Sequence, residues 1–222
     1  ITEDPAKDGV NWYSYCAGDP VNMVDPSGMY DRNEAVKYAM KYSVLSKKNE
    51  WEQLFDDKKP PVRFSQDCTN FVSRCLFEGD LHMSDDWYYN LTYGSGDYVI
   101  GSYSATWTNS EEQFKAFTNC TGEFPNSDYI NGNAICIHES KWIADSITQY
   151  GIQPGDILYF QNPQNQQMGH TAIIVSTDNG RIQYAQHDDD KNNGDLGLYL
   201  DENQNNPGAF TYVYIVRIRD DA

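Results

Sequence analysis

Cys68 is the residue of this sequence best placed to act as a nucleophile. It directly follows Asp67, at the start of a segment whose apolar residues recur at helical spacing: Cys68, Phe71, Val72, Cys75 and Leu76. A helix N-terminus favours a thiolate, because its backbone N–H groups lack helical partners and the helix dipole is positive there. The Cys68 N–H would be free to donate to an oxyanion, beside a helix cap formed by Gln66 and Asp67. The alternative is an inert buried thiol, which we expect for Cys75.

A thiolate nucleophile needs a base, and the sequence offers four histidines. His82 lies in a polar loop and is expected to be exposed, and His138 directly precedes a predicted helix. His170 follows Gly169 at the head of the apolar, strand-like run TAIIVS. A strand is a rigid platform for a catalytic group, and a glycine lets a neighbouring group approach closely. We therefore predict that His170 is the base, with a core histidine as the alternative.

The residue that orients His170 is expected on the next strand. An Asn179-Gly180 turn would pair the strand of His170 with one that ends at His187. His187 would then lie near His170 and could hold one of its ring nitrogens, as the third member of a triad does. Gln186 and Asp188 are alternatives for this role. Because side chains alternate across a strand, His187 and Gln186 cannot both face His170.

The same side chains could in principle bind zinc. Cys68, His170 and His187 would hold the ion and leave an open fourth position, and their spacing neither supports nor excludes this. The five cysteines form no CxxC pair and no tandem metal-binding spacing. We therefore predict no metal and no cofactor.

The elements that would position these residues indicate an α+β fold, with N-terminal helices packed on an antiparallel sheet. Helical spacing and capping residues predict helices over about 31–47, 67–79, 111–118 (capped by Ser110) and 139–150. Apolar and β-branched runs predict strands over 156–160, 171–176, 181–187 and 210–218, arranged as a meander. We expect loops over 80–108, with one short hairpin, and over 188–207. Trp87 and Trp107 are candidates for the lining of a substrate cleft.

The charge balance limits the partners. The chain has 33 acidic and 16 basic residues, a formal charge of -17. This disfavours nucleic acid and anionic membranes and would attract a basic protein partner. No apolar run approaches the ~20 residues of a membrane span, and ITEDPAKDGVNWY shows no signal peptide. Because the first residue is not Met, we expect a piece of a longer protein.

Residues 5–29, which end in DPSGM, resemble the end of an Rhs-type (YD-repeat) core. That family carries a DPxG motif followed by a hydrophobic residue, usually Leu, where this chain has Met29. The resemblance implies self-cleavage between Met29 and Tyr30, so that 1–29 belong to an upstream Rhs shell. Residues 30–222 would be a C-terminal toxin, exported and delivered as an effector, with a cognate immunity protein as partner.

The motifs YDRNEAVKYAMKY, DCTNFVSRCL, QPGDILYF, GHTAIIV and YAQH resemble an amidase domain of the papain-like superfamily, related to the NlpC and CHAP peptidoglycan amidases. The resemblance implies a papain-like fold, Cys68 as nucleophile, His170 as base and a polar third residue on the next strand. The Gln186-His187 pair matches the family's QH, which favours His187. Residues 80–135 match poorly, and substrate selection is expected there.

Together these features predict a cysteine-dependent amidase or peptidase that forms an acyl-enzyme on Cys68, with peptidoglycan peptide amides as the candidate substrate. One alternative is an acyltransferase, a transglutaminase-like enzyme or a deamidase that modifies a target protein. A dry, aromatic-lined cleft near Trp87 or Trp107 would favour transfer over hydrolysis. The other alternative is a non-enzymatic binding module, against which the intact Cys68 and His170 argue.

Overall fold

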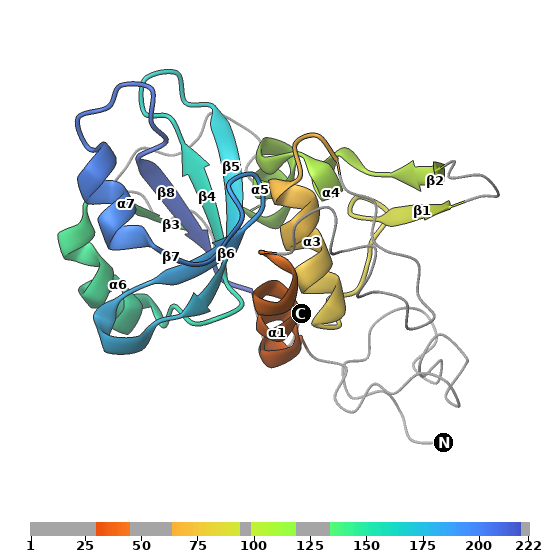
Figure 1. Cartoon of the computed structure of the whole chain (residues 1–222), viewed down its shortest axis with the longest axis horizontal. Coiled ribbons are helices and arrows are strands. Elements are labelled where there is room, and N and C mark those ends of the chain that lie inside the picture. The colour runs from red at the N-terminus through yellow and green to blue at the C-terminus, as the bar shows by residue number, and fades with distance from the viewer. Residues whose placement is uncertain (1–29, 45–63, 94–98, 119–133, 219–222) are drawn as a thin grey trace.

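The computed structural model describes residues 30–44, 64–93, 99–118 and 134–218 and confirms the predicted α+β class. Its main sheet has six antiparallel strands in the order β3-β8-β4-β5-β6-β7 (Figure 1). The strands are β3 (Ala134–Ile137), β4 (Ile157–Gln161), β5 (Met168–Ser176), β6 (Gln183–Gln186), β7 (Lys191–Asp195) and β8 (Tyr212–Val216). The expected simple meander is wrong, because β8 inserts between β3 and β4.

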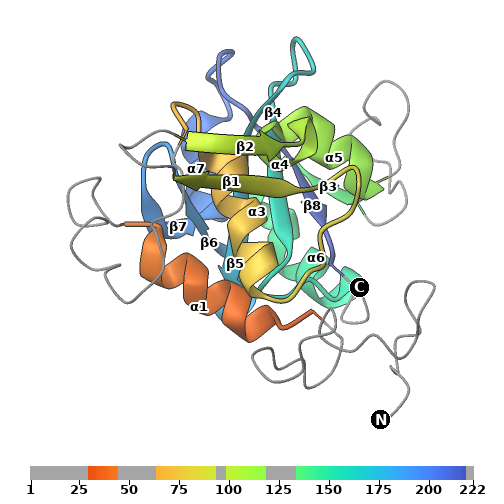
Figure 2. The same ribbon diagram turned by 90° about the vertical axis from the view of Figure 1, so that its right-hand side faces the viewer.

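Helices cover both faces of this sheet (Figure 1). On one face lie α1 (Arg32–Tyr42), α3 (Cys68–Glu78) and α5 (Ser110–Thr118), and on the other lie α6 (Ile143–Tyr150) and α7 (Leu196–Asn203). The remaining elements are β1 (Tyr89–Tyr93), β2 (Val99–Tyr103), α4 (Ala105–Thr108) and the 3-10 turns η2 (Ser140–Trp142) and η3 (Asp178–Gly180). Strands β1 and β2 form the expected hairpin, which lies in front of α3 in Figure 2.

Burial on both faces explains why the strand runs are almost wholly apolar. One set of side chains packs against α1, α3 and α5: Ile157, Tyr159, Ile173, Ala185, Tyr214 and Val216. The alternate set packs with residues of α6 and α7: Leu158, Phe160, Ala172, Ile174, Tyr184, Val213 and Ile215. The side chain of any strand residue is therefore assigned to a face by its place in this alternation.

The helix boundaries follow from local capping. Asp31 begins α1 as predicted, since its carboxylate accepts from the backbone N–H groups of Asn33 and Glu34, at 2.9 and 3.1 Å. Gly79 ends α3 as predicted. The cap of α5 is Asn109, whose side chain accepts from the N–H of Glu111 and of Glu112. The prediction of Ser110 as cap is therefore wrong by one residue, and Ser110 lies inside the helix.

The predicted loop over 188–207 is also wrong. It contains β7 and α7, and the Asp195 carboxylate starts α7 by accepting from the Leu198 N–H at 3.1 Å. Leu196 and Leu200 then bury against the sheet. In the sequence, these two leucines are the main apolar signal for α7, and β7 is a short edge strand. The many Asp and Asn residues of the segment are typical of turns and loops, and they led to the wrong prediction.

The QPGD segment clamps the start of α1 to the sheet. Asp156 is fully buried, and its carboxylate pairs with the Arg32 guanidinium at 2.8 Å. It also accepts from the backbone N–H of Ile218 at 3.1 Å. Gly155 has a φ of +90°, and a Cβ there would meet Tyr30 and Arg32 at 3.1 Å. This motif is therefore structural, because glycine supplies both the backbone conformation and the space.

Several predictions fall on residues that the structure does not describe. Met29 and the rest of 1–29 lie outside the described residues, as do 94–98 and 119–133 of the segment expected to select substrate. Tyr30 is described and buried, and its hydroxyl donates to the Gly155 carbonyl at 3.0 Å. In the described part of the chain, no helix combines the length and the apolar character needed to cross a bilayer.

Candidate active site

Cys68 is the first residue of α3, as the apolar spacing predicts. The helix packs against β5, so its N-terminus lies at the end of the sheet where His170 is carried. Cys68 is 8% exposed, whereas Cys75 on the same helix is fully buried. Both thiols are thus buried, and the expectation that Cys75 is a core residue is confirmed.

Cys68 and His170 shift each other's pKa values. Burial raises the pKa of the Cys68 thiol, but the hydrogen bond and charge of His170 outweigh it, and the Thr171 backbone and Thr69 hydroxyl add to their effect. The pKa of Cys68 therefore lies below its ordinary value. Burial lowers the pKa of His170, and the hydrogen bond and charge of the thiolate more than offset it, so this pKa is raised. Both directions favour a thiolate–imidazolium pair.

Gln186 holds the other side of the His170 ring. Its Oε1 lies 2.9 Å from Nε2 of His170, and the glutamine is 5% exposed. The Gln186 amide nitrogen donates to the carbonyls of Asp188 and Asp189, at 3.4 and 3.2 Å. This fixes Oε1 as the acceptor, so Nε2 of His170 carries the proton that it donates. The Nδ1 atom of His170 is thereby left for the thiol.

The prediction that His187 orients His170 is wrong. Tyr184 and Gln186 share the face of the sheet that carries Ala172 and Ile174, and residue 170 falls on the same alternation. His187 falls on the other alternation, with Ala185 and Ile173. The strand pairing therefore selects Gln186, one of the two alternatives, as the partner of His170.

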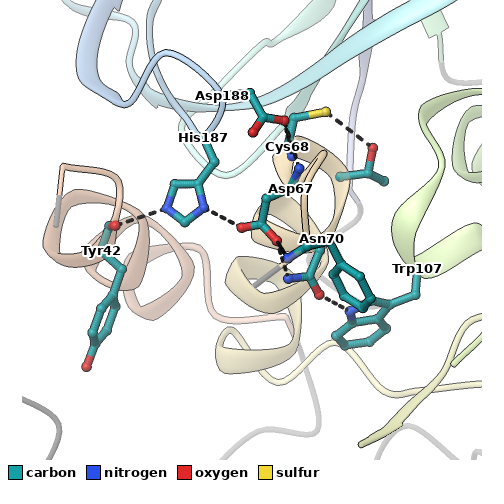
Figure 3. Close-up of polar contacts among 9 residues, drawn as sticks. Tyr42, Asp67, Cys68, Asn70, Trp107, His187 and Asp188 are labelled. Carbon is teal, nitrogen blue, oxygen red and sulfur yellow. Dashed lines mark hydrogen bonds and ion pairs between the residues drawn. The ribbon is translucent and has the colours of Figure 1, made fainter. Parts of the chain in front are cut away.

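His187 instead ties together three elements (Figure 3). Its Nδ1 lies 2.6 Å from Oδ2 of Asp67, and its Nε2 lies 3.1 Å from the carbonyl oxygen of Tyr42. The ring also stacks on Phe71, with centroids 4.1 Å apart. The Asp67 carboxylate and the Tyr42 carbonyl are both acceptors, so each ring nitrogen of His187 faces an acceptor. These engagements point His187 away from Cys68 and His170, and the three do not assemble the zinc site considered above.

The residues expected to cap α3 have other roles. The Asp67 side chain makes no capping hydrogen bond to the helix. Its Oδ1 accepts from the Phe64 N–H at 2.8 Å and from the Asn70 amide at 2.9 Å. Gln66 is exposed. The carboxylate at the helix N-terminus belongs to Asp188, whose Oδ2 accepts from the N–H of Asp67 at 2.7 Å and of Cys68 at 3.1 Å.

A buried hydroxyl cluster lies beside the sulfur and was not predicted. The Ser110 hydroxyl is 2.9 Å from that of Thr69 and 2.8 Å from that of Thr171, and it lies 4.0 Å from the Cys68 sulfur. Thr69 and Thr171 directly follow Cys68 and His170 in sequence, which is the one signal that could have drawn attention to them. Ser110 lies 42 positions from Cys68 and carries no such signal.

Trp87 and Trp107 do not line a cleft. They are 3% and 0% exposed and stack on each other with centroids 4.7 Å apart. Their indole N–H groups donate to the Ser73 hydroxyl at 3.1 Å and to the Asn70 side-chain oxygen at 2.9 Å. A buried indole is stable where its N–H finds such a partner, so the prediction of cleft residues is corrected to core residues.

Comparisons with known proteins agree with an amidase-type domain. The family described as "Putative amidase domain" matches residues 29–214. "Uncharacterized protein YhbB" of Bacillus subtilis (strain 168) is 23% identical over 163 residues, which cover 72% of this chain and 46% of that relative. The chain thus spans less than half of the relative's length. No solved structure matches significantly. Because the family match extends over most of the sequence, the chain belongs to the "Putative amidase domain" family.

Proposed function

We propose that this domain is a cysteine amidase of the papain-like type. The observation that carries the proposal is the Cys68–His170 pair at the N-terminus of α3, with Gln186 on the far side of the imidazole. A thiolate at a helix N-terminus, a histidine on the adjacent strand and an amide that orients it make up a papain-like nucleophilic site. The covering of an antiparallel sheet by the cysteine-bearing helix supports the same assignment.

The proposed reaction proceeds through an acyl-enzyme. The Cys68 thiolate adds to the amide carbonyl, and the His170 imidazolium gives its proton to the departing amine, which leaves a thioester on Cys68. A water molecule then attacks the thioester, His170 takes up the proton of that water, and the acid product and free thiol are released. Gln186 acts as a positioning residue, because it holds Nε2 of His170 and so directs Nδ1 to the reacting atoms.

We also propose a delivery context for the enzyme. The DPSGM motif before Tyr30 supports cleavage between Met29 and Tyr30, with residues 30–222 as a toxin and 1–29 as the end of an Rhs shell. A cognate immunity protein would then protect the producing cell. The excess of acidic over basic residues favours a basic patch on that protein. Mass spectrometry of the chain expressed with its upstream shell should find an N-terminus at Tyr30, and an intact junction would contradict the proposal.

The direct test is incubation of the protein with purified peptidoglycan, the proposed substrate. New muropeptides should appear with the wild-type chain and be lost with Cys68→Ala and with His170→Ala. Cys75→Ala is the matched control, since it removes a thiol from the same helix two turns from the reactive position. All variants should retain the wild-type circular dichroism spectrum. A Cys68→Ala variant that is fully active on peptidoglycan and fully toxic would overturn the proposal.

Acyl transfer to an amine and deamidation of glutamine would use the same acyl-enzyme. The aromatic lining that would favour transfer is no longer supported, because Trp87 and Trp107 are core residues. Hydrolysis is therefore the proposed outcome. Mass spectrometry of proteins from target cells distinguishes the alternatives: adducts would indicate transfer, and conversion of a glutamine to glutamate would indicate deamidation.

A further inference from the structure

Asp188 is an exposed residue whose carboxylate lies against the site (Figure 3). Its Oδ2 accepts from the backbone N–H of Asp67 at 2.7 Å and of Cys68 at 3.1 Å. It comes from the turn between β6 and β7, 120 positions from Cys68. The N-terminus of α3 is therefore occupied by a carboxylate from a distant turn, although Asp67 directly precedes the helix.

The Cys68 N–H is also the donor that the proposed reaction needs. When a thiolate adds to an amide carbonyl, the carbonyl oxygen becomes an oxyanion next to the nucleophile, and backbone N–H groups at a helix N-terminus stabilise it. One N–H cannot bind both the Asp188 carboxylate and this oxyanion at full strength. The two negative charges would also repel each other at this distance.

The turn that carries Asp188 is held in an uncommon conformation. Asp188 and Asp189 have φ angles of 61° and 82°, in the left-handed region that residues with a Cβ seldom adopt. The backbone carbonyls of both residues accept from the Gln186 amide, which also holds His170. The Asp188 side chain is thus exposed enough to move into solvent, while its backbone is anchored to the residue that positions the base.

We propose that the Asp188 carboxylate occupies the oxyanion position and must withdraw before an acyl group can react with Cys68. This inference rests on the proposed cysteine amidase function. It makes Asp188 a gate, because only a substrate bound tightly enough to displace the carboxylate reaches the Cys68 N–H. The hydrogen bonds of Asp188 are to the backbone N–H groups of Asp67 and Cys68, so reagents that attack the sulfur and form no oxyanion should react without displacing Asp188.

Two probes separate these cases. N-acetylglycinal adds to a thiol to give a hemithioacetal whose oxygen needs the oxyanion position. Dipyridyl disulfide reacts with a thiolate by exchange at sulfur, which releases pyridine thione and needs no oxyanion donor. The measurement is the aldehyde concentration that halves the rate of disulfide exchange at Cys68, with the modified residue located by mass spectrometry.

Asp188→Gly removes the carboxylate, and glycine readily adopts the φ of 61° found at this position. We expect the half-protecting aldehyde concentration to fall by about tenfold or more, the usual value of displacing hydrogen bonds to a charged group. Asp188→Asn tolerates the same backbone conformation and keeps a neutral acceptor, so it should give a smaller fall. Asp189→Gly is the matched control, because Asp189 is also left-handed and should leave aldehyde protection unchanged.

The possible results distinguish this inference from the proposed function. If dipyridyl disulfide shows no preference for Cys68 in the wild-type chain, the reactive pair itself is wrong and both proposals fail. If Cys68 reacts but Asp188→Gly and Asp188→Asn both keep the wild-type aldehyde protection, Asp188 is only a helix cap and the gate is wrong. Should the glycine variant fail to fold, the asparagine variant decides by the same comparison.

Discussion

Helix α1 is held at each end by a pair of ionisable side chains with a buried carboxylate, and only one of these pairs lies beside Cys68. At its start, Arg32 pairs with Asp156 at 2.8 Å. At its end, the Tyr42 carbonyl accepts from His187, which pairs with Asp67 at 2.6 Å. In both pairs the acidic residue is at most 2% exposed. The two regions therefore combine similar chemistry with different positions relative to Cys68.

The difference shows that burial and charge alone do not identify a functional pair. Asp156 directly precedes β4, and its carboxylate accepts from the N–H groups of Gln153 and Ile218. This end of β4 is the one farther from Cys68. Asp67 directly precedes Cys68, so a shift of its carboxylate or of His187 moves the start of α3. We therefore expect damage at Arg32–Asp156 to affect stability alone, and damage at His187–Asp67 to affect both stability and the reactivity of Cys68.

Asp156→Ala should have the largest effect on stability. It removes the carboxylate from the partly buried Arg32 and takes an acceptor from the Gln153 and Ile218 N–H groups. Breaking a buried ion pair costs about 3–5 kcal/mol, so the free energy of unfolding in urea should fall by that amount. Glu34→Ala, which breaks the exposed Lys37–Glu34 pair, is the control and should change little. Selective loss of Cys68 reactivity in folded Asp156→Ala would contradict the expectation that the Arg32–Asp156 pair affects stability alone.

His187→Gln should have the second-largest effect on stability, and it should also lower the reactivity of Cys68. It removes a donor to the Asp67 carboxylate and the stacking on Phe71. The free energy of unfolding should fall by about 1.5–3 kcal/mol, as for a hydrogen bond to a charged group. The rate of Cys68 exchange with dipyridyl disulfide should fall in the same variant below its unfolding transition. If that rate is unchanged, His187 stabilises the fold without positioning α3.

Gln186→Ala should change the pH dependence of the reactive pair. The thiolate–imidazolium pair forms as pH rises through the pKa of Cys68, which is lowered, and is lost as pH rises through the pKa of His170, which is raised. The Gln186 hydrogen bond contributes to the raised pKa of His170. Its loss should therefore move the alkaline limb of the pH profile, where the pair is lost, to lower pH. The maximal rate of disulfide exchange should fall by about fivefold, the value of one neutral hydrogen bond.

The control for this pH profile is Arg32→Lys in the Arg32–Asp156 pair. It should leave both the acidic and the alkaline limb of the profile unchanged. Gln186→Glu should move the alkaline limb in the opposite direction, because a carboxylate next to His170 favours the imidazolium more than an amide does. An unmoved alkaline limb in Gln186→Ala would show that Gln186 does not act on His170.

Ser110→Ala should have the smallest effect. It removes the central hydroxyl of the cluster beside Cys68, but the Thr69 and Thr171 hydroxyls lie 3.1 Å apart and can pair with each other. The loss of unfolding free energy should be about 0.5–1 kcal/mol. The rate of disulfide exchange at Cys68 should change less than in His187→Gln. A larger change would mean that the hydroxyl cluster, rather than the His187–Asp67 pair, holds the thiolate.

Local pattern was sufficient for most elements of the fold. The cap of α1, the apolar spacing of α3, and the apolar runs of β4, β5 and β8, of which the helix and the strands bury a stripe or face, are features that the sequence displays directly. Pattern failed for β7 and α7, where the polar composition of the segment masked two buried leucines. The insertion of β8 between β3 and β4 is a non-local pairing, and no short window of residues encodes it.

The sequence by itself determined which atoms could react: a thiol at the first position of an amphipathic helix and an imidazole at the head of a buried strand. Helix ends and strand runs are local properties, so these two positions could be predicted. Only the tertiary structure decided the partners. Pairing of β5 with β6 set the alternation that turns Gln186 toward His170 and His187 toward Asp67. It also brought Asp188, 120 positions away, to the N–H of Cys68, because α3 packs against β5 and β6 and its first residues then meet the turn that follows β6.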